Sequence, residues 1–350
     1  MKRLLNTLYN SQPDRYLSLD GENIVISCEG KEIVRVPLHN LEQIVTFGYA
    51  GVSPALMGKC ARDGISLAFM RRDGRFLARV EGEVKGNVLL RREQYRIADN
   101  PERSIAIARN MIMAKLFNSR WVLERTIRDH ALRINTELLK QKSMYLQSAL
   151  TVVDSAENSG TLRGIEGEAA SVYFSVFDEI ILQQKDDFHF EKRSRRPPLN
   201  RVNALLSFAY SLMTIQCASS LEAVGLDPYV GFFHTDRPGR RSLALDMVEE
   251  QRSYCDEEQR SYCDRFVLTL INKRYIQPDH FEVREDGAVL LNENGREVFL
   301  KYWQERKQEK LTHPYLDEKL EWGMLPYVQS LLLARYIRGD IDAYPPFLWK

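Results

Sequence analysis

The spacing of apolar residues changes once along the chain, near residue 90. Before that point, short runs of alternating or β-branched apolar residues are separated by glycine and aspartate turns, a pattern typical of strands. Residues 53–61 instead suit one short helix, with Ser53 as its N-cap and Pro54 in its first turn. We therefore predict a β-rich N-terminal domain over residues 1–92. Its clearest strand patterns lie at 23–26, 32–36 and 65–69.

From Asn100-Pro101 onward, apolar residues recur every three or four positions, as they do on the buried face of a helix. Residues 204–217 form a more continuously apolar stretch that Asn203 introduces, and its polar members favour a helix in the protein core over a membrane span. The predicted fold class is therefore α+β. A larger, all-helical domain over residues 93–350 follows the small β-rich domain.

Composition narrows the function classes. The 350 residues are enough for two domains with separate cores, and 49 basic against 48 acidic residues give a net charge of only +1. Any binding of DNA must then come from local basic patches. No window holds the ~20 apolar residues that span a bilayer, and the start of the chain has no apolar leader, so we expect a cytoplasmic protein.

Two common kinds of site are not indicated. The five cysteines form neither a CxxC pair nor an even disulfide framework, which fits a reducing compartment and argues against structural zinc. The nearest approach to a phosphate-binding loop, residues 51–59, has its glycines too far apart, and its lysine is followed by cysteine. Dependence on a nucleotide is therefore not expected.

Acidic and imidazole groups stand in two separated, otherwise apolar segments. Glu166 lies within GIEGE, His234 ends GFFH, and Asp246 and Glu249 belong to LALDMVEE. Asp246 and Glu249 are three residues apart and would share one face of a helix. Charged groups are seldom left in such surroundings unless they pair with another group or bind a cation. We predict a metal site built from these four residues.

The donor types suit phosphodiester chemistry. A Lewis acid polarises the phosphate and orients the attacking oxygen while negative charge builds up. Carboxylate oxygens favour Mg²⁺, and an imidazole nitrogen makes Mn²⁺ equally suitable. Each residue also has a simpler interpretation. Glu166 can be a carboxylate near the amides of a helix start, and His234 can be a hydrogen-bonded structural histidine.

Basic residues gather in two places that could meet a DNA backbone. One is a proline-terminated loop that contains Lys192, Arg193, Arg195 and Arg196, and the other is the turn after His234, with Arg237, Arg240 and Arg241. Either group can equally be a solvated surface. Tyr210 has two interpretations as well, either positioning or stacking against DNA or lying in the core with its hydroxyl satisfied.

The order of these motifs resembles one family. RGIEG at 163–167, NALLSFAY at 203–210, GFFH at 231–234 and SLALDMVEE at 242–250 are similar to the CRISPR-associated spacer-acquisition integrases, the Cas-one family. The resemblance extends from YLSLDG at 16–21 to YPPFLW at 344–349, and its details are most similar to subtype I-C.

The resemblance implies specific roles. Glu166, His234 and Glu249 match the family's metal ligands, Asp246 is an additional catalytic acidic group, and Arg252 matches a basic position that faces substrate phosphate. It further implies attack by the 3′-hydroxyl ends of a short double-stranded DNA fragment on phosphodiesters of a CRISPR repeat, without a covalent protein intermediate. The implied assembly is a homodimer, commonly joined through the β domain, on a dimer of the small Cas-two protein.

A tandem octad departs from the family pattern. Residues 249–256, EEQRSYCD, are repeated identically at 257–264. A continuous helix would carry the second copy about 12 Å along its axis and rotate it by about 80°, so Glu249 and Glu257 cannot serve one site. We assign Glu249, because its spacing from Asp246 is undisturbed. The sequence leaves open whether the insertion bulges out or shifts the following helix.

Two other functions remain possible at this stage. The same metal centre can use water as the nucleophile, which would make the protein a branched-DNA nuclease. The octad beside Glu249 motivates a hypothesis of another class, a catalytically impaired DNA-binding scaffold.

Overall fold

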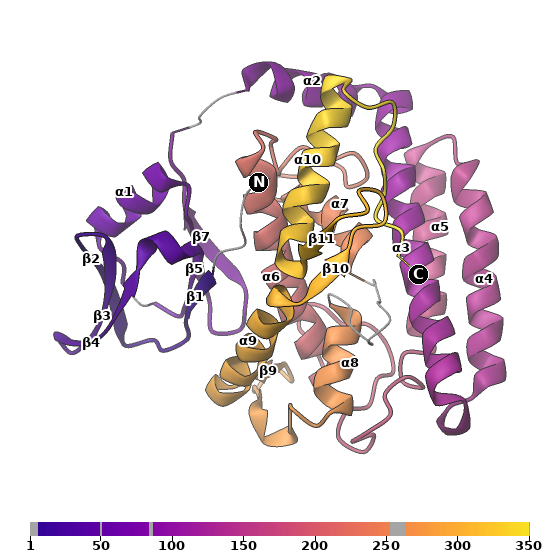
Figure 1. Cartoon of the computed structure of the whole chain (residues 1–350). Coiled ribbons are helices and arrows are strands. Elements are labelled where there is room, and N and C mark those ends of the chain that lie inside the picture. The colour runs from indigo at the N-terminus through magenta and orange to yellow at the C-terminus, as the bar shows by residue number, and fades with distance from the viewer. Residues whose placement is uncertain (1–5, 50, 84–86, 253–262, 350) are drawn as a thin grey trace.

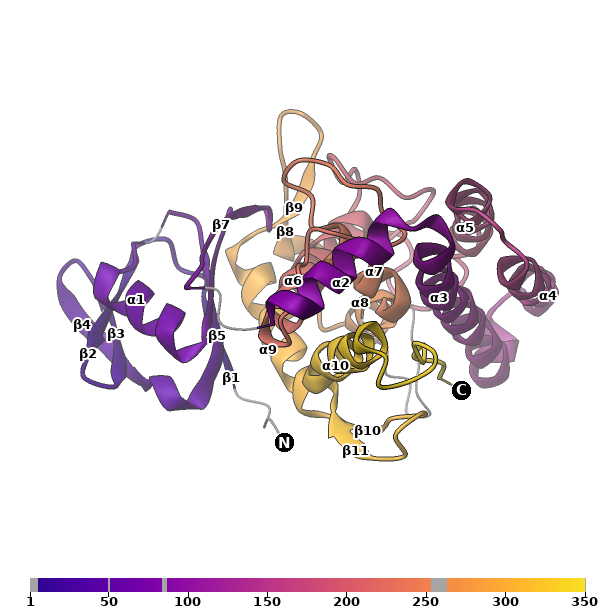
Figure 2. The same cartoon turned by 90° about the horizontal axis from the view of Figure 1, so that it is seen from above.

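A β-rich lobe and a larger helical body make up the molecule. The computed structural model describes residues 6–49, 51–83, 87–252 and 263–349. In Figures 1 and 2 the β-rich lobe lies at one side, helices α4 and α5 lie at the opposite edge, and α6 and α10 lie between them. The predicted α+β class is confirmed.

Two sheets build the β-rich lobe. The first has the order β1-β5-β6-β7, in which β1, β5 and β6 are parallel and β7 is antiparallel to β6. The second is the antiparallel meander β2-β3-β4. The strands span Asn6–Asn10, Arg15–Asp20, Asn23–Cys28, Lys31–Pro37, Leu41–Phe47, Ser66–Met70 and Phe76–Val80 for β1 to β7. A 3₁₀ turn at Leu38–Asn40 precedes β5.

Helix α1, Pro54–Asp63, closes the core of this lobe. The side chain of Ser53 accepts a hydrogen bond from the Leu56 amide, as expected for an N-cap followed by proline, and the helix ends at left-handed Gly64. Leu56 and Cys60 on its inner face are fully buried against Leu17, Ile24, Ile44 and Leu67, residues from strands of both sheets. The predicted helix and the three predicted strands are confirmed.

The helical body contains nine α-helices within the described ranges. Six of them begin with an asparagine N-cap, at positions 87, 100, 135, 158, 200 and 292, whose side chain accepts an amide hydrogen bond three residues on. Their bounds are Val88–Asp99, Pro101–His130, Thr136–Asp154, Ser159–Phe174, Arg201–Ala223, Ser242–Gln251, Asp264–Asn272, Glu293–Gln308 and Leu325–Arg338 for α2 to α10.

The body is not wholly helical, contrary to the prediction. Two short antiparallel hairpins interrupt it, since a three-residue strand leaves too short a pattern to be recognised in a sequence. They are β8–β9, Phe281–Val283 with Val289–Leu291, and β10–β11, Lys310–Thr312 with Lys319–Glu321. Short 3₁₀ turns lie at Ala131–Arg133, Pro278–His280 and Trp322–Met324.

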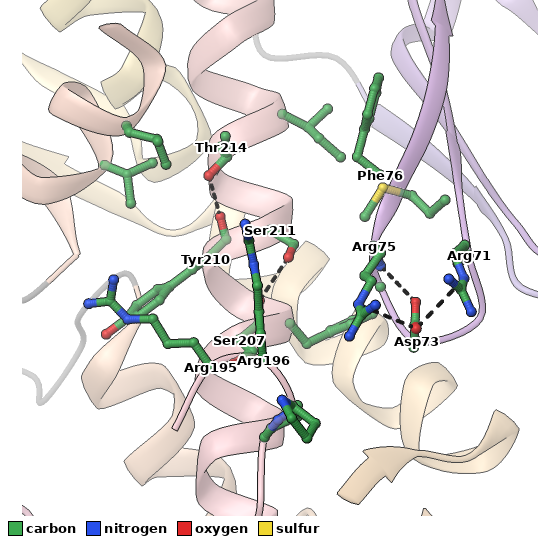
Figure 3. Close-up of a pocket in the computed structure, with 18 of the residues that line it drawn as sticks. Arg71, Asp73, Arg75, Phe76, Arg195, Arg196, Ser207, Tyr210, Ser211 and Thr214 are labelled. Carbon is green, nitrogen blue, oxygen red and sulfur yellow. Dashed lines mark hydrogen bonds and ion pairs between the residues drawn. The ribbon is translucent and has the colours of Figure 1, made fainter. Parts of the chain in front are cut away.

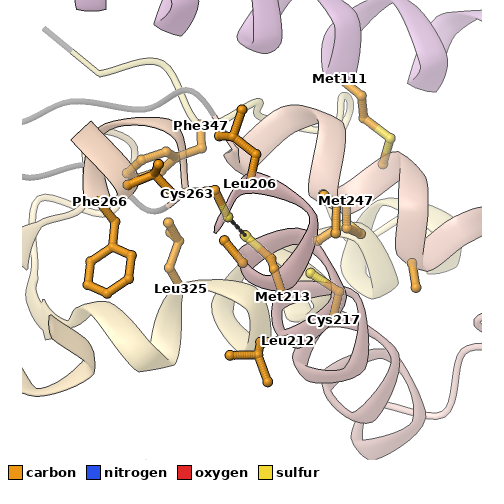
Figure 4. Packing of buried hydrophobic residues seen from close by; sticks show 14 of the residues in the cluster. Met111, Leu206, Leu212, Met213, Cys217, Met247, Cys263, Phe266, Leu325 and Phe347 are labelled. Atoms are coloured by element: carbon orange, nitrogen blue, oxygen red, sulfur yellow. Dashed lines mark hydrogen bonds between the residues drawn. The ribbon is translucent and has the colours of Figure 1, made fainter. Parts of the chain in front are cut away.

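Helix α6 is the central helix of the body. By length and composition it could cross a membrane, but 67% of its most apolar window is buried inside the protein, as in a core helix. It packs against α7, α8 and α10. Figure 4 shows Met213 of α6 facing Cys263, the residue before α8, with Leu206 and Phe347 nearby. The four described cysteines, including Cys263, are free thiols.

The lobe is seated on the body by aromatic packing. Phe47 of β5 stacks on Phe208 of α6, with ring centroids 5.8 Å apart, and Phe208 meets Phe299 of α9 edge to face at 4.9 Å. Gly74, in the β6–β7 turn, has φ +78°, and a β-carbon there would come within 2.5 Å of the Phe208 ring. Helix α2 begins at Val88, close to the expected boundary at 92, which stays a prediction.

The C-terminal segment, residues 344–349, bonds to both α7 and α3 and holds these helices together. Glu250 of α7 is fully buried and accepts hydrogen bonds from the Tyr344 hydroxyl (2.6 Å), the Gln329 amide (2.5 Å) and the Phe347 backbone (2.9 Å). Asn118 of α3 donates to the carbonyls of both Glu250 and Phe347. The closing YPPFLW motif therefore holds the helix that carries Asp246 and Glu249.

The two described residues on either side of the 253–262 gap, Arg252 and Cys263, are joined by a backbone hydrogen bond. The amides of Cys263 and Asp264 donate to the carbonyl of Arg252, at 3.3 and 3.1 Å. If eight residues were removed between them, the Asp264 bond would become the ordinary i to i+4 bond of a continuous α-helix. Helix α8, which begins at Asp264, therefore continues the hydrogen-bond pattern of α7 as if eight residues had been added between them. Glu257 and Cys255 lie outside the described residues.

Deleting residues 253–260 should therefore leave the fold intact and raise the free energy of unfolding by up to about 2 kcal/mol, because a segment of about ten residues no longer has to be closed. Removing either copy of the octad gives the same sequence, so one variant suffices. Urea unfolding followed by circular dichroism measures the change. A variant less stable than the parent would mean that the octad itself contributes stabilising contacts.

Candidate active site

The loop that carries His234 is fixed by Asp246. This carboxylate is fully buried on α7 and accepts hydrogen bonds from the backbone amides of Phe232 (2.7 Å), Phe233 (3.0 Å) and His234 (2.9 Å). It also lies 2.7 Å from His234 Nδ1. A β-carbon at Gly231 would come within 2.7 Å of Asp246 Oδ2, so the glycine of GFFH permits this close approach.

The contacts of Asp246 fix the orientation of the His234 ring, and its part as an additional catalytic acidic group stays a prediction. With Nδ1 engaged by an acceptor, the imidazole is held as the tautomer that leaves the Nε2 lone pair free for a ligand. Because every oxygen of Asp246 already accepts hydrogen bonds and none is exposed, it orients His234.

Glu166 of α5 and Glu249 of α7 face one buried cation, Lys115 of α3. The ammonium of Lys115 lies 2.7 Å from Glu249 Oε2 and pairs with Glu166 Oε1 as well. Arg252 reaches the same Glu249 oxygen at 3.2 Å. The side chains of Lys115 and Arg252 are only 2% and 3% exposed, whereas those of Glu166, Glu249 and His234 are 20%, 13% and 23% exposed.

These cations determine the ionisation of Glu249. Burial by itself would raise the pKa of this carboxyl, but Arg252 and Lys115 lower the pKa well below its usual range. Glu249 is therefore ionised at any pH at which the protein would be assayed, as a metal ligand must be.

Glu166, Glu249 and His234 have donor atoms that suit a divalent ion, but the three side chains are not arranged around a single point. Within the described ranges, no three Asp, Glu, His or Cys side chains are close enough together to hold a metal ion. The reason is local, since Lys115 stands between Glu166 and Glu249. Two carboxylates and an imidazole with a free Nε2 are ligands that Mg²⁺ and Mn²⁺ accept.

Beside this site lies an arginine-lined groove of about 1160 Å³. His234 and Glu249 lie in its wall together with residues of α6, the β6–β7 hairpin of the lobe and the β8–β9 hairpin. Figure 3 shows Arg71 and Arg75 on the hairpin at one side and Arg195 and Arg196 beside α6 at the other. The two parts of the molecule thus share one basic cleft.

The predicted basic residues divide into two groups. Lys192, Arg195, Arg196 and Arg237 are exposed. Arg193, Arg240, Arg241 and Arg252 are engaged within the protein. Arg240 hydrogen-bonds the carbonyl and hydroxyl of Thr235, and the buried Arg241 lies 3.9 Å from the centre of the Phe76 ring of the lobe.

Arg193 is a structural residue of the basic loop. Its guanidinium donates to Asn203 Oδ1 (2.8 Å), Ser207 Oγ (3.1 Å) and the Ser194 carbonyl (2.6 Å), and it lies over the Tyr210 ring. Burial lowers the pKa of Arg193 to about 10. Asn203, predicted as a helix start, lies one turn inside α6 and anchors the loop instead, while Asn200 caps the helix.

Tyr210 is half-buried in the wall of the groove, so both of its predicted roles stay open. Its hydroxyl donates to Asp264 Oδ1, and its ring lies between the guanidinium groups of Arg193 and Arg252, at 5.3 and 5.6 Å from the ring centre. Burial raises the pKa of Tyr210. The aromatic ring therefore positions Arg252 beneath Glu249.

Sequence reasoning missed Lys115 and the arginines of both hairpins. Lys115 is one of 49 basic residues, and no motif separates it from the others. Arg71, Arg72, Arg75 and Arg284 line the groove but come from turns far from the acidic motifs in the sequence. The helical period of α3 carried the only available signal, since it places Lys115 on the buried face with Met111 and Ile112.

Comparison with known proteins decides the family. The family model described as CRISPR associated protein Cas1 matches residues 8–305. The chain belongs to the Cas1 family. A CRISPR-associated endonuclease Cas1 of Chlorobaculum tepidum is 49% identical over 350 residues, which cover all of both chains. A CRISPR-associated endonuclease Cas1 of Rhodospirillum rubrum is 48% identical, again over the whole of both chains.

Solved structures share the Cas1 fold of this chain. A casposase bound to its integration product superposes with a TM-score of 0.82 at 20% identity, covering 100% of this chain and 95% of that one. A CAS1 protein from Thermotoga maritima gives a TM-score of 0.79 at 24% identity, covering 96% and 97%. At these identities the likeness concerns the fold, in which a β-rich lobe precedes a helical body.

Proposed function

We propose that this Cas1 protein is a metal-dependent DNA integrase of CRISPR adaptation. It joins the 3′-hydroxyl ends of a short DNA fragment to phosphodiesters of a CRISPR repeat by direct transesterification. The observation that carries the proposal is that Glu166 and Glu249 share one buried cation, while Glu249 and an oriented His234 lie in the wall of an arginine-lined groove.

Each part of the site has a role in this reaction. Glu166, His234 Nε2 and Glu249 would hold a Mg²⁺ or Mn²⁺ ion, which when bound polarises the phosphate and favours ionisation of the attacking hydroxyl. Asp246 keeps the imidazole in the tautomer that offers Nε2. Arg195, Arg196 and Arg237, with the hairpin arginines, bind the backbone phosphates and align the strand.

The proposed partners follow from the family. A TM-score of 0.81 relates this chain to a chain of a Cas6-RT-Cas1–Cas2 complex, of which it covers 36%, and this supports Cas2 as the partner. That Cas2 takes part as a dimer is part of the proposal. We further propose a cytoplasmic homodimer joined through the β-rich lobe. The I-C subtype is also part of the proposal, supported by the YLSLDG and YPPFLW motifs.

The deciding experiment supplies a fragment with free 3′-hydroxyl ends to a supercoiled plasmid that carries a repeat, with purified Cas1, its cognate Cas2 and Mn²⁺ or Mg²⁺. Covalent joining by the parent and not by His234→Ala supports the integrase. Cleavage of branched DNA without joining would favour the nuclease. DNA binding without any turnover would favour the scaffold, and the octad deletion then tests whether the insertion is responsible.

Replacing Arg195 and Arg196 together by alanine should weaken DNA binding and reduce the slope of log K against log salt by about 2, since each lost phosphate contact contributes about 0.9. Arg193 stays, because it holds the loop. The matched control is Arg335→Ala with Arg338→Ala, which removes the same charge from exposed positions on α10. Fluorescence anisotropy at several salt concentrations measures the slope. An unchanged slope would show that the loop does not touch phosphate.

A further inference from the structure

Lys115 occupies the place where the two metal-binding carboxylates converge. Its side chain is 2% exposed and comes from the middle of α3, surrounded by buried neighbours such as Met111, Ile112 and Leu116. It pairs with Glu166 on α5 and, at 2.7 Å, with Glu249 on α7. A single ammonium thus ties together three helices at the proposed catalytic centre.

The charges around this point balance without any added ion. Glu166 and Glu249 supply two negative charges, and Lys115 and Arg252 supply two positive charges. A buried carboxylate without a cation is strongly disfavoured, so this arrangement is one that the protein can fold into on its own. A divalent ion entering between the carboxylates would bring two further charges into a site that is already neutral.

The two cations differ in how firmly they are held. Arg252 lies against the rings of Phe174 and Tyr210, at 5.8 and 5.6 Å from their centres, and is fixed by aromatic packing as well as by Glu249. Lys115 is held by its ion pairs with the two glutamates. A lysine ammonium is also a compact charge on a flexible four-carbon stem, so it is the group that can move aside.

We propose that Lys115 is a positioning residue that acts as the resident counter-cation of the metal site. Its ammonium holds Glu166 and Glu249 together when no metal is bound, and it must be displaced from between them when a divalent ion enters. Lys115 therefore lowers the affinity of the site for metal and stabilises the metal-free protein. The inference rests on the proposed function, since it takes these glutamates as metal ligands.

The test measures Mn²⁺ binding to the full-length protein by electron paramagnetic resonance, without DNA or any assay of activity. Lys115→Met keeps the length of the side chain and removes its charge. Removing a positive charge next to the ion should tighten Mn²⁺ binding by about ten-fold or more. The metal-free variant should melt several degrees lower than the parent, and saturating Mn²⁺ should restore more of its stability than it adds to the parent.

A matched control exists elsewhere in the chain. Lys307 of α9 is also 2% exposed and pairs with Glu42 at 3.0 Å and with Thr7 at 2.9 Å, far from the groove. Lys307→Met should lower the melting temperature as well but leave the Mn²⁺ affinity unchanged. This variant separates a loss of general stability from an effect on the metal site.

The outcomes distinguish the inference from the function on which it rests. Mn²⁺ binding by Lys115→Met at the parent's affinity, or more weakly, overturns the counter-cation role and leaves the metal site standing. If neither protein binds Mn²⁺ in a way that Glu249→Gln abolishes, the metal site itself is wrong and the inference fails with it. If Lys115→Met does not fold, Lys115→Gln replaces it, since glutamine is neutral and can donate a hydrogen bond to one carboxylate. Lys115→Gln should also bind Mn²⁺ more tightly than the parent, and equal or weaker binding would overturn the counter-cation role.

Discussion

Changing His234 to alanine should abolish strand transfer, with a rate at least about 10³-fold below that of the parent, while the fold is retained. The imidazole would contribute one of three metal ligands, and a metal ion that stabilises developing charge on phosphate is worth several kcal/mol, about tenfold in rate for each 1.4 kcal/mol. Gel-based joining assays on the repeat plasmid give the rate, and circular dichroism reports the fold.

Retention of the fold follows from the structure of the loop. In His234→Ala, Asp246 loses the hydrogen bond from Nδ1 but keeps the three backbone amides of Phe232, Phe233 and residue 234. The cost is that of about one hydrogen bond, roughly 1 kcal/mol. Glu166→Ala should likewise lose turnover and stay folded. Unfolding of either variant would contradict a site built on a preformed scaffold.

His189→Ala is the matched control for this prediction. His189 is 61% exposed beside Asp178 and Glu191, and it does not line the groove. Its removal should leave joining within about twofold of the parent, because surface substitutions rarely shift stability by more than about 0.5 kcal/mol. A His234→Ala protein with activity within tenfold of the parent would remove His234 from the metal site.

The second large effect is a loss of stability as the pH rises, caused by Glu250. Burial raises the pKa of this carboxyl from 4.5 to about 7, although hydrogen bonds from Tyr344, the Phe347 backbone and Gln329 oppose the shift. The folded protein therefore binds this proton more tightly than the unfolded chain does. Its contribution is fully present below about pH 4.5 and is lost as the pH rises to about 7, a decrease of about 3 kcal/mol in the free energy of unfolding.

Other groups change stability in the same range, so the measurement must isolate Glu250. The lowered pKa of Glu249 stabilises the folded protein as the pH rises from low values, which is opposite to the effect of Glu250. The pKa of Glu222 is raised, so its effect on stability has the same sign as that of Glu250. Urea unfolding from about pH 5 to pH 8 should show Glu250→Gln gaining stability relative to the parent as the pH increases. The control Glu305→Gln, at an exposed position on α9, should follow the parent. Parallel curves for Glu250→Gln and the parent would show that Glu250 is ionised in the folded protein throughout.

Glu250 also links the C-terminal segment to the helix that carries Glu249. Glu250 adjoins Glu249, and the segment that it anchors runs from α10 through Tyr344 to Phe347. Ionising this carboxyl destabilises the folded state because a charge is then buried, although the hydrogen bonds from Tyr344, Gln329 and Phe347 favour the ionised form. The C-terminal motif that resembles the family's closing residues is thus part of the support of the active site.

The sequence by itself determined the architecture and the acidic centre. Period-2 runs in β3 and β4, the Ser53-Pro54 helix start and the 3.6-residue period of α3 are local signals, because side chains repeat on one face of a strand or helix at these spacings. The ordered motifs marked Glu166, His234 and Glu249 as candidate ligands, and the structure pairs Glu166 and Glu249 with one lysine. The order and spacing of these motifs carried the resemblance to the Cas1 family, and the comparison with known proteins decided it.

Only the tertiary structure decided what the individual charges do. In the sequence, Arg193 and Arg195 are equivalent members of a basic loop, yet one is bonded to Asn203 and Ser207 and the other is exposed to the groove. Lys115 and the hairpin arginines enter the site through packing between α3, α5 and α7 and between the lobe and the body. A charge acts according to its distance from other charges and its exposure to water, and both depend on contacts between residues remote in sequence.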